Sequence, residues 1–132
     1  MTVKKQLKPQ GKIIPNGVSL EKHENDIVIV FTNLGYDVEL IPTARQRKTK
    51  TADAIIAGLE WEFKTPREGS THALDRILRK ATTQSQNVIV DIRLLKIPND
   101  IALRRIAHVS RIIKTLQHLK VVAKTNKIID IK

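Results

Sequence analysis

Two carboxylates and one lysine stand close together in the sequence, in a spacing that could support catalysis. Asp53 is followed, after eight intervening residues, by Glu62 and then by Lys64. The runs 52–57 and 59–64 each have the composition of a short strand. We therefore expect the three side chains to lie on two adjacent strands.

A tight turn at Gly58-Leu59 would join these strands, since glycine suits the first central position of a hairpin turn. Such a turn predicts a register in which Asp53 pairs with Lys64 and Ile55 pairs with Glu62. Side chains alternate between the two faces of a strand, and directly paired residues project to the same face. Both carboxylates and the ammonium should therefore converge on one face, within roughly 5–8 Å of one another.

The convergence of two carboxylates is the pattern expected of a divalent cation site. Two carboxylates about 4 Å apart repel each other by about 4 kcal/mol at an effective dielectric constant near 20, and a bound cation removes this repulsion. Carboxylate oxygens are ligands that Mg²⁺ and Mn²⁺ prefer. Lys64 could orient a water molecule and stabilise charge on a phosphate oxygen. A solvated strand face with a cross-strand Asp–Lys pair is the alternative that the spacing leaves open.

The elements that must position these residues can be read from apolar spacing and capping residues. Helices are predicted over residues 20–34, 70–83 and 99–118, capped by Ser19, Ser70 and Asn99. Strands are predicted at 36–41, 52–57, 59–64, 87–92, 120–124 and 127–131, the last two forming a hairpin. Strands interleaved with helices predict an α/β fold with a mixed sheet.

Composition indicates a single basic domain. Among 132 residues, 24 Lys and Arg stand against 13 Asp and Glu, a formal net charge of +11. Such a surplus favours a polyanionic partner, most often nucleic acid. The sequence contains no cysteine, which excludes disulfides, thiolate metal sites and cysteine nucleophiles. No apolar run approaches the roughly 20 residues of a membrane span, so we expect no membrane partner.

The positive charge is concentrated in three places. Residues 1–18 have the composition of a basic flexible arm, which leaves residues 19–132 as the domain. A basic loop precedes the hairpin, and its cations are candidates for binding a phosphate backbone: Arg45, Arg47, Lys48 and Lys50. Arginines on the outer face of the long helix could act with it. The few aromatic residues argue against a platform for stacking bases.

The pattern of Asp53, Glu62 and Lys64 within this element order resembles the PD-(D/E)xK nuclease superfamily, whose core is αβββαβ. It is similar in more detail to the C-terminal tRNA-nuclease toxin domains of contact-dependent growth inhibition (CdiA) proteins. The matching stretches are His23-Glu24, Thr51-Ala52-Asp53, Trp61-Glu62-Phe63-Lys64-Thr65-Pro66 and Gln84-Ser85-Gln86-Asn87-Val88-Ile89. One position departs from the toxin pattern, because Ala52 stands where the family has proline. The resemblance implies a nuclease-like core with a mixed central sheet, followed by a C-terminal helix and a short hairpin.

The resemblance also implies roles for individual residues. Asp53 and Glu62 would be metal ligands, and Lys64 would be the catalytic lysine. Glu24, on the apolar stripe of the first helix, would complete the acidic site. Gln84 resembles the glutamine that follows the second core helix, although a polar helix terminus explains it equally well.

For several other polar side chains, a functional role is less strongly indicated than a structural one. Ser70 and Thr71 could contact phosphate at a helix N-terminus, although capping is the simpler interpretation. The histidines are scattered in the sequence, and His23 is expected to be only solvated.

Three functions are compatible with the sequence. The first is a nuclease dependent on Mg²⁺ or Mn²⁺, a toxin-type RNase acting on tRNA. The second is a DNA endonuclease of the same superfamily, of a mobile-element or restriction type. The third is a non-catalytic basic nucleic-acid-binding protein. For a toxin, the resemblance implies an acidic immunity protein as a partner and a cytoplasmic site of action, reached by delivery into a cell. The oligomeric state stays open.

Overall fold

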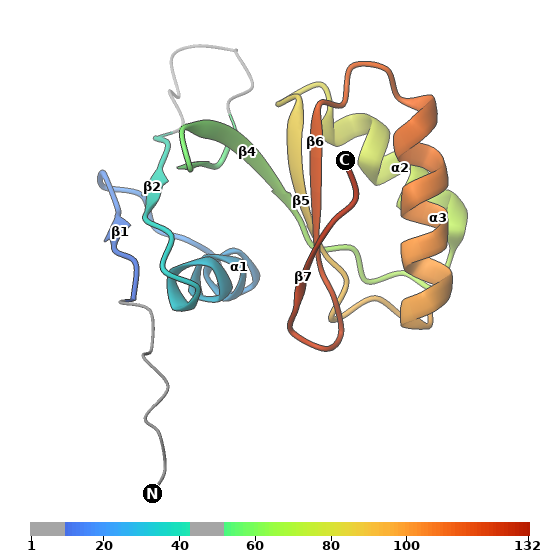
Figure 1. Ribbon diagram of the computed structural model, residues 1–132, viewed down its shortest axis with the longest axis horizontal. Helices are drawn as coiled ribbons and strands as arrows, with labels where there is room; N and C mark the ends of the chain where they lie inside the picture. Colours follow the sequence, from blue (N-terminus) through green and yellow to red (C-terminus); the bar gives the residue numbers. More distant parts are fainter. Residues whose placement is uncertain (1–9, 43–51) are drawn as a thin grey trace, which may run out of the picture.

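The computed structural model describes residues 10–42 and 52–132. In this part of the chain, three helices pack against one seven-stranded mixed sheet (Figure 1). The predicted α/β class with a mixed sheet is confirmed. The elements are β1 (Ile13–Ile14), α1 (Lys22–Asn33), β2 (Val38–Leu40), β3 (Ala54–Ile56), β4 (Leu59–Lys64), α2 (Thr71–Ala81), β5 (Asn87–Asp91), α3 (Asn99–Ile112), β6 (His118–Val122) and β7 (Ile128–Asp130).

The strands follow one another across the sheet in the order in which they occur in the chain. β2, β3 and β4 form an antiparallel meander, whereas β4, β5 and β6 run parallel to one another. The parallel pairs are joined by α2 and α3, because parallel neighbours require a crossover. β4 therefore belongs to both halves of the sheet and connects the meander with the parallel part (Figure 1).

Two apolar cores lie on opposite faces of the sheet. α1 covers one face with Ile27, Val28 and Phe31, which pack with Trp61 and Phe63 of β4. α2 and α3 cover the other face, as Figure 1 shows. Side chains alternate along β5, so Val88 and Val90 pack in the core under α2 and α3, and Ile89 packs in the core under α1. This explains why the 87–92 run is continuously apolar.

The helices begin and end at recognisable signals. Ser70 caps α2, its hydroxyl accepting a hydrogen bond from the Ala73 amide at 3.4 Å. α1 begins later than predicted, with Glu21 rather than Ser19 as its N-cap. Pro98, not the predicted Asn99, occupies the N-cap position of α3, where no side chain forms a cap hydrogen bond, and the helix ends at Ile112, six residues before the predicted end. Its predicted extension to 118 is wrong because Ile113 adopts an extended conformation and His118 already belongs to β6.

The prediction of a flexible arm over residues 1–18 is wrong for residues 10–18. Ile13 and Ile14 form β1, which pairs in parallel with β2. The Gly11 amide donates to the Thr32 carbonyl at 2.8 Å, and a Cβ at Gly11 would lie 1.8 Å from the Tyr36 carbonyl oxygen. Only glycine therefore permits this close approach to the segment after α1. Residues 1–9 lie outside the described residues.

Candidate active site

A cleft of about 370 Å³ brings together side chains from both halves of the sheet. It is formed by the start of α1, the entry to β3, the end of β4 and the segment after α2. All five predicted catalytic residues line it: Glu24, Asp53, Glu62, Lys64 and Gln84. Residues separated by up to 60 positions thus meet around one volume, as the resemblance had implied.

Glu62 is the most deeply placed of these side chains. It is only 2% exposed, although the other face of β4 carries the core residues Trp61 and Phe63. Burial, together with the neighbouring Asp53 carboxylate, raises the pKa of Glu62 from 4.5 to about 8, against the opposing effect of Lys64. At neutral pH a carboxyl group with this pKa is mostly protonated, and a nearby cation would favour its ionised form.

Asp53 is fixed by backbone contacts at the point where the chain enters β3. Its Oδ2 accepts a hydrogen bond from the Phe63 amide at 2.7 Å, and its own amide donates to the Trp61 carbonyl at 2.9 Å. Glu62 lies between these two partners in the sequence, so the two carboxylates are held beside each other. The Asp53 side chain is also within hydrogen-bond reach of the Glu62 carboxyl group.

The predicted hairpin register is wrong by two residues. Ala54 pairs with Trp61 and Ile55 with Glu60, which places Asp53 level with Glu62 rather than with Lys64. The turn is centred on Ala57-Gly58, whose φ angles of 53° and 80° are those of a type I′ turn. Because the shift is an even number of residues, each side chain keeps its predicted face.

Lys64 and Gln84 both contact the Glu62 carboxylate. Lys64 Nζ lies 3.3 Å from Glu62 Oε2, and its side chain is 26% exposed, so the ammonium borders the open part of the cleft. With its amide nitrogen turned toward Glu62, Gln84 donates to both carboxylate oxygens, at 3.0 Å for Oε1. Gln84 therefore fixes the orientation of Glu62.

Glu24 reaches the cleft from the first turn of α1. It is half-buried, and its Oε1 accepts a hydrogen bond from the Glu21 amide at 3.2 Å. Glu24 thus also caps its own helix, a role that the apolar spacing did not indicate. Within residues 10–42 and 52–132, its Oε2 accepts no hydrogen bond.

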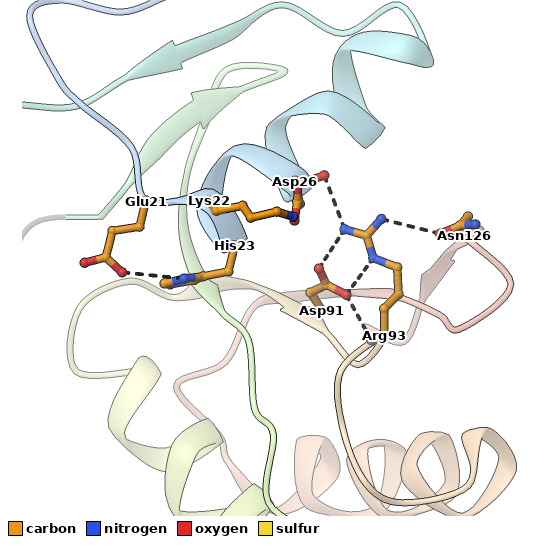
Figure 2. Close-up of polar contacts among 7 residues, drawn as sticks. All are labelled: Glu21, Lys22, His23, Asp26, Asp91, Arg93 and Asn126. Carbon is orange, nitrogen blue, oxygen red and sulfur yellow. Dashed lines mark hydrogen bonds and ion pairs between the residues drawn. The ribbon is translucent and has the colours of Figure 1, made fainter.

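Glu21 and His23 also line the cleft, although neither was predicted as a site residue; the matched stretch His23-Glu24 was the signal that could have identified His23. His23 Nδ1 lies 3.5 Å from Glu21 Oε2, a contact drawn in Figure 2. His23 is half-buried, so the expectation that it is only solvated is wrong. One potential ligand atom from each of Glu21, His23 and Glu24 lies within 4.8 Å of the others, so this turn adds further candidate ligands.

Thr65 is another polar residue of the cleft that sequence reasoning did not assign to the site. It follows Lys64 and lines the cleft. Its hydroxyl oxygen is buried and has no hydrogen-bond partner among the described residues. Its position in the matched Trp61–Pro66 stretch was the only signal that could have identified it.

The predicted nucleic-acid-binding residues lie elsewhere. Arg45, Arg47, Lys48 and Lys50 fall outside the described residues. Ser70 and Thr71 stand at the start of α2, where Ser70 acts as the cap, and neither is among the described residues that line the cleft.

A second, basic groove of about 410 Å³ runs along α3. Arg104, His108 and Arg111 line it, spaced along one side of the helix. Arg105, also in the lining, is engaged by Asp75 of α2, its Nε lying 2.9 Å from Asp75 Oδ1. Among residues 10–42 and 52–132, Arg104 and Arg111 have no carboxylate partner within 4.0 Å. Their charges are available to an external anion.

Within the described part of the chain, none of the helices has the length and apolar character needed to cross a membrane.

A family model matches more than half of the chain. The model of the contact-dependent growth inhibition CdiA C-terminal domain matches residues 50–128, a span that contains every predicted catalytic residue except Glu24. No curated protein matches the chain.

A solved structure shares the fold. It is a chain of a "CdiA-CT/CdiI toxin and immunity complex from Burkholderia pseudomallei", with a TM-score of 0.71 and 20% sequence identity, and the similarity covers 92% of this chain and 99% of that one. At this identity the similarity shows a common fold. The family model matches more than half of the 132 residues, and the chain therefore belongs to the contact-dependent growth inhibition CdiA C-terminal domain family.

Proposed function

We propose that this domain is a divalent-metal-dependent nuclease of the PD-(D/E)xK type, a toxin that hydrolyses phosphodiester bonds in tRNA. The observation that carries the proposal is the cleft in which Glu24, Asp53, Glu62, Lys64 and Gln84 meet. Three carboxylates, one ammonium and one carboxamide around one open volume form a set suited to phosphoryl chemistry.

The donor set fits Mg²⁺ or Mn²⁺. Asp53, Glu62 and Glu24 would hold the ion, since hard divalent cations take carboxylate oxygens and water. Without a cation, Glu62 has a pKa of about 8 and keeps its proton at neutral pH. A bound ion would favour the ionised carboxylate, and it would supply Lewis-acid stabilisation of charge on the phosphate.

The remaining residues act on the water and on the phosphate. Hydrolysis forms a bond between a water oxygen and phosphorus and breaks the bond between phosphorus and the leaving oxygen, which takes up a proton. Lys64, at the open side of the cleft, stabilises negative charge on the phosphate oxygens and helps to orient the attacking water. Gln84 keeps the Glu62 oxygens directed into the cleft.

The choice of RNA rests on the toxin resemblance and is supported by charge. A net charge of +11 favours a polyanion. Basic side chains, including Arg104 and Arg111 of the α3 groove, are suited to contacts with a phosphate backbone. The few aromatic residues argue for contacts with backbone rather than with stacked bases.

The test is a comparison of substrates. The purified protein is incubated with total RNA and with plasmid DNA, with Mg²⁺ or Mn²⁺ and with EDTA. Selective loss of tRNA that EDTA prevents supports the proposal, whereas nicking of the plasmid supports the DNA endonuclease. If the protein binds nucleic acid but cleaves neither substrate, and Lys64→Ala behaves identically, the domain is a non-catalytic binding protein.

A toxin needs a neutralising partner in the cell that makes it, and its target must be accessible where it acts. We propose an acidic immunity protein as the partner and the cytoplasm of a recipient cell as the site of action. The similar solved structure is itself a complex of a toxin with an immunity protein. Cells that express this domain should stop growing, and co-expression of the reading frame next to its gene should restore their growth. Growth arrest that persists despite this co-expression would argue against such a partner.

A further inference from the structure

Arg93, outside the cleft, connects three segments that are distant in the sequence (Figure 2). Its Nε and Nη2 donate to the two oxygens of Asp91 at 2.9 and 2.7 Å. Nη2 also donates to the Asp26 carbonyl of α1 at 3.2 Å, and Nη1 donates to Asn126 Oδ1 at 3.4 Å. One guanidinium therefore joins the end of β5, the first half of α1 and the β6–β7 turn.

The anchor of this contact is rigid. Asp91 is 2% exposed and forms the last position of β5, paired with Val122 of β6. It accepts from both the backbone amide and the side chain of Arg93, which fixes the guanidinium plane. A buried carboxylate with this geometry holds its partner in one orientation.

The anchor is also close to the catalytic strand. Val90, which precedes Asp91, is the β5 residue paired with Lys64. On the other side, the carbonyl that Arg93 contacts belongs to Asp26, two residues after Glu24. Arg93 therefore forms a polar connection between α1 and β5, the strand that pairs with β4 at Lys64.

Apolar packing alone does not fix the position of α1 relative to the sheet. Ile27, Val28 and Phe31 hold α1 against the sheet, but contacts between apolar side chains are not directional. A hydrogen bond to one carbonyl fixes the position of the helix along its axis. A displacement of about 1 Å is enough to impair a catalytic arrangement.

We propose that Arg93 is a positioning residue, which holds the first half of α1, and with it Glu24, in register with Glu62 and Lys64. This role rests on the proposed metal site. The pair Asp91–Arg93 would then affect catalysis by positioning Glu24, without contacting the substrate.

The variant Arg93→Lys tests the role. Lysine keeps a charge beside Asp91 but lacks the planar fork that reaches Asp26 and Asn126 at the same time. We expect Mn²⁺ affinity, measured by calorimetry, to fall about 10-fold. We expect the α1 amides of the metal-free protein to exchange hydrogen faster, by NMR. In a Glu24→Gln background, Arg93→Lys should change Mn²⁺ affinity less than 2-fold.

Two further variants make the result decisive. Asn126→Gly removes the outermost bond while retaining a residue suited to the φ of 64°, and it should cause a smaller loss in the same direction. Lys22→Met is the matched control, since the exposed Lys22 side chain pairs only with the half-buried carboxylate of Asp26 on the same helix among the described residues.

If Arg93→Lys lowers Mn²⁺ affinity equally in the wild-type and Glu24→Gln backgrounds, the proposal is overturned, because the contact would then be merely structural. Unchanged exchange in α1 for both Arg93→Lys and Asn126→Gly would overturn it as well. If the wild-type protein binds no Mn²⁺, the proposed function fails separately, and the exchange measurement alone decides whether Arg93 positions α1.

Discussion

Replacement of Glu62 by glutamine should stabilise the metal-free protein at alkaline pH. Glu62 is 2% exposed beside Asp53, and its pKa is raised from 4.5 to about 8. A carboxyl group whose pKa is raised by folding binds its proton more tightly in the folded state. Its contribution to stability is complete below pH 4.5 and is lost as the pH rises through about 8.

The size of the effect follows from the two pKa values. At 1.36 kcal/mol per unit, the wild-type protein should lose at most about 3–4 kcal/mol between pH 5 and pH 8 through this group. For a domain of this size, that corresponds to a difference of roughly 10 °C in the melting temperature. Glutamine does not titrate and has nearly the same shape, so Glu62→Gln should lack this loss.

The assay is thermal unfolding in EDTA at several pH values from 5 to 8.5. Glu60→Gln is the matched control, because Glu60 is an exposed carboxylate on the same strand. The difference in melting temperature between Glu62→Gln and wild type should grow with pH, whereas Glu60→Gln should follow wild type. Added Mn²⁺ should stabilise wild type and not Glu62→Gln.

A difference that stays constant with pH would refute this reasoning, because the Glu62 carboxyl would then titrate alike in the folded and unfolded chains. A strong destabilisation by Glu62→Gln at pH 8 would show that the carboxylate has a structural role.

Three further predictions concern cleavage, folding and binding. Lys64→Ala should reduce cleavage at least 100-fold while retaining Mn²⁺ binding by calorimetry, whereas Asp53→Asn should lose both; loss of binding in Lys64→Ala would contradict the assigned role. Ala57→Asn should raise the free energy of unfolding by about 0.5–1 kcal/mol in urea titrations, since asparagine tolerates the positive φ of this turn better than alanine; an unchanged midpoint would argue against strain at Ala57. Replacing Arg104 and Arg111 by alanine should remove one to two phosphate contacts. In titrations at several KCl concentrations, each lost contact should reduce the slope of log binding constant against log salt concentration by about 0.7–0.9. An unaltered slope would show that the α3 groove does not contact RNA.

The sequence was most informative where local chemistry determines the structure. Ser70 predicted the start of α2 because a serine cap satisfies an amide whatever the rest of the fold. The convergence of Asp53 and Glu62 was predicted correctly despite a wrong register. The period of two along a strand determines the face of a side chain, and an even shift leaves it unchanged.

The errors occurred where the structure depends on distant contacts. β1 comprises only Ile13 and Ile14, and it forms because the chain after α1 returns beside it, which no local pattern indicates. α3 ends at Ile112 although Leu116 continues the apolar spacing, since Leu116 is buried from a turn instead. Asp91 was included only as part of the predicted strand 87–92, and its partner Arg93 contacts Asp26 and Asn126, which come close to it only in the folded chain.

The order of strands in the sheet has a consequence for how the chain reaches this structure. Each strand pairs with the strand that precedes it in the sequence, so every pairing in the sheet joins consecutive strands, some directly through a turn and some across one helix. Such a topology can grow from the N-terminus as the polypeptide emerges, each new strand adding to an existing edge. The five predicted catalytic residues lie between positions 24 and 84, so all of them emerge during synthesis before Asn126 does. On a growing chain, the Arg93 contact with Asn126 is therefore the last of these connections that can form.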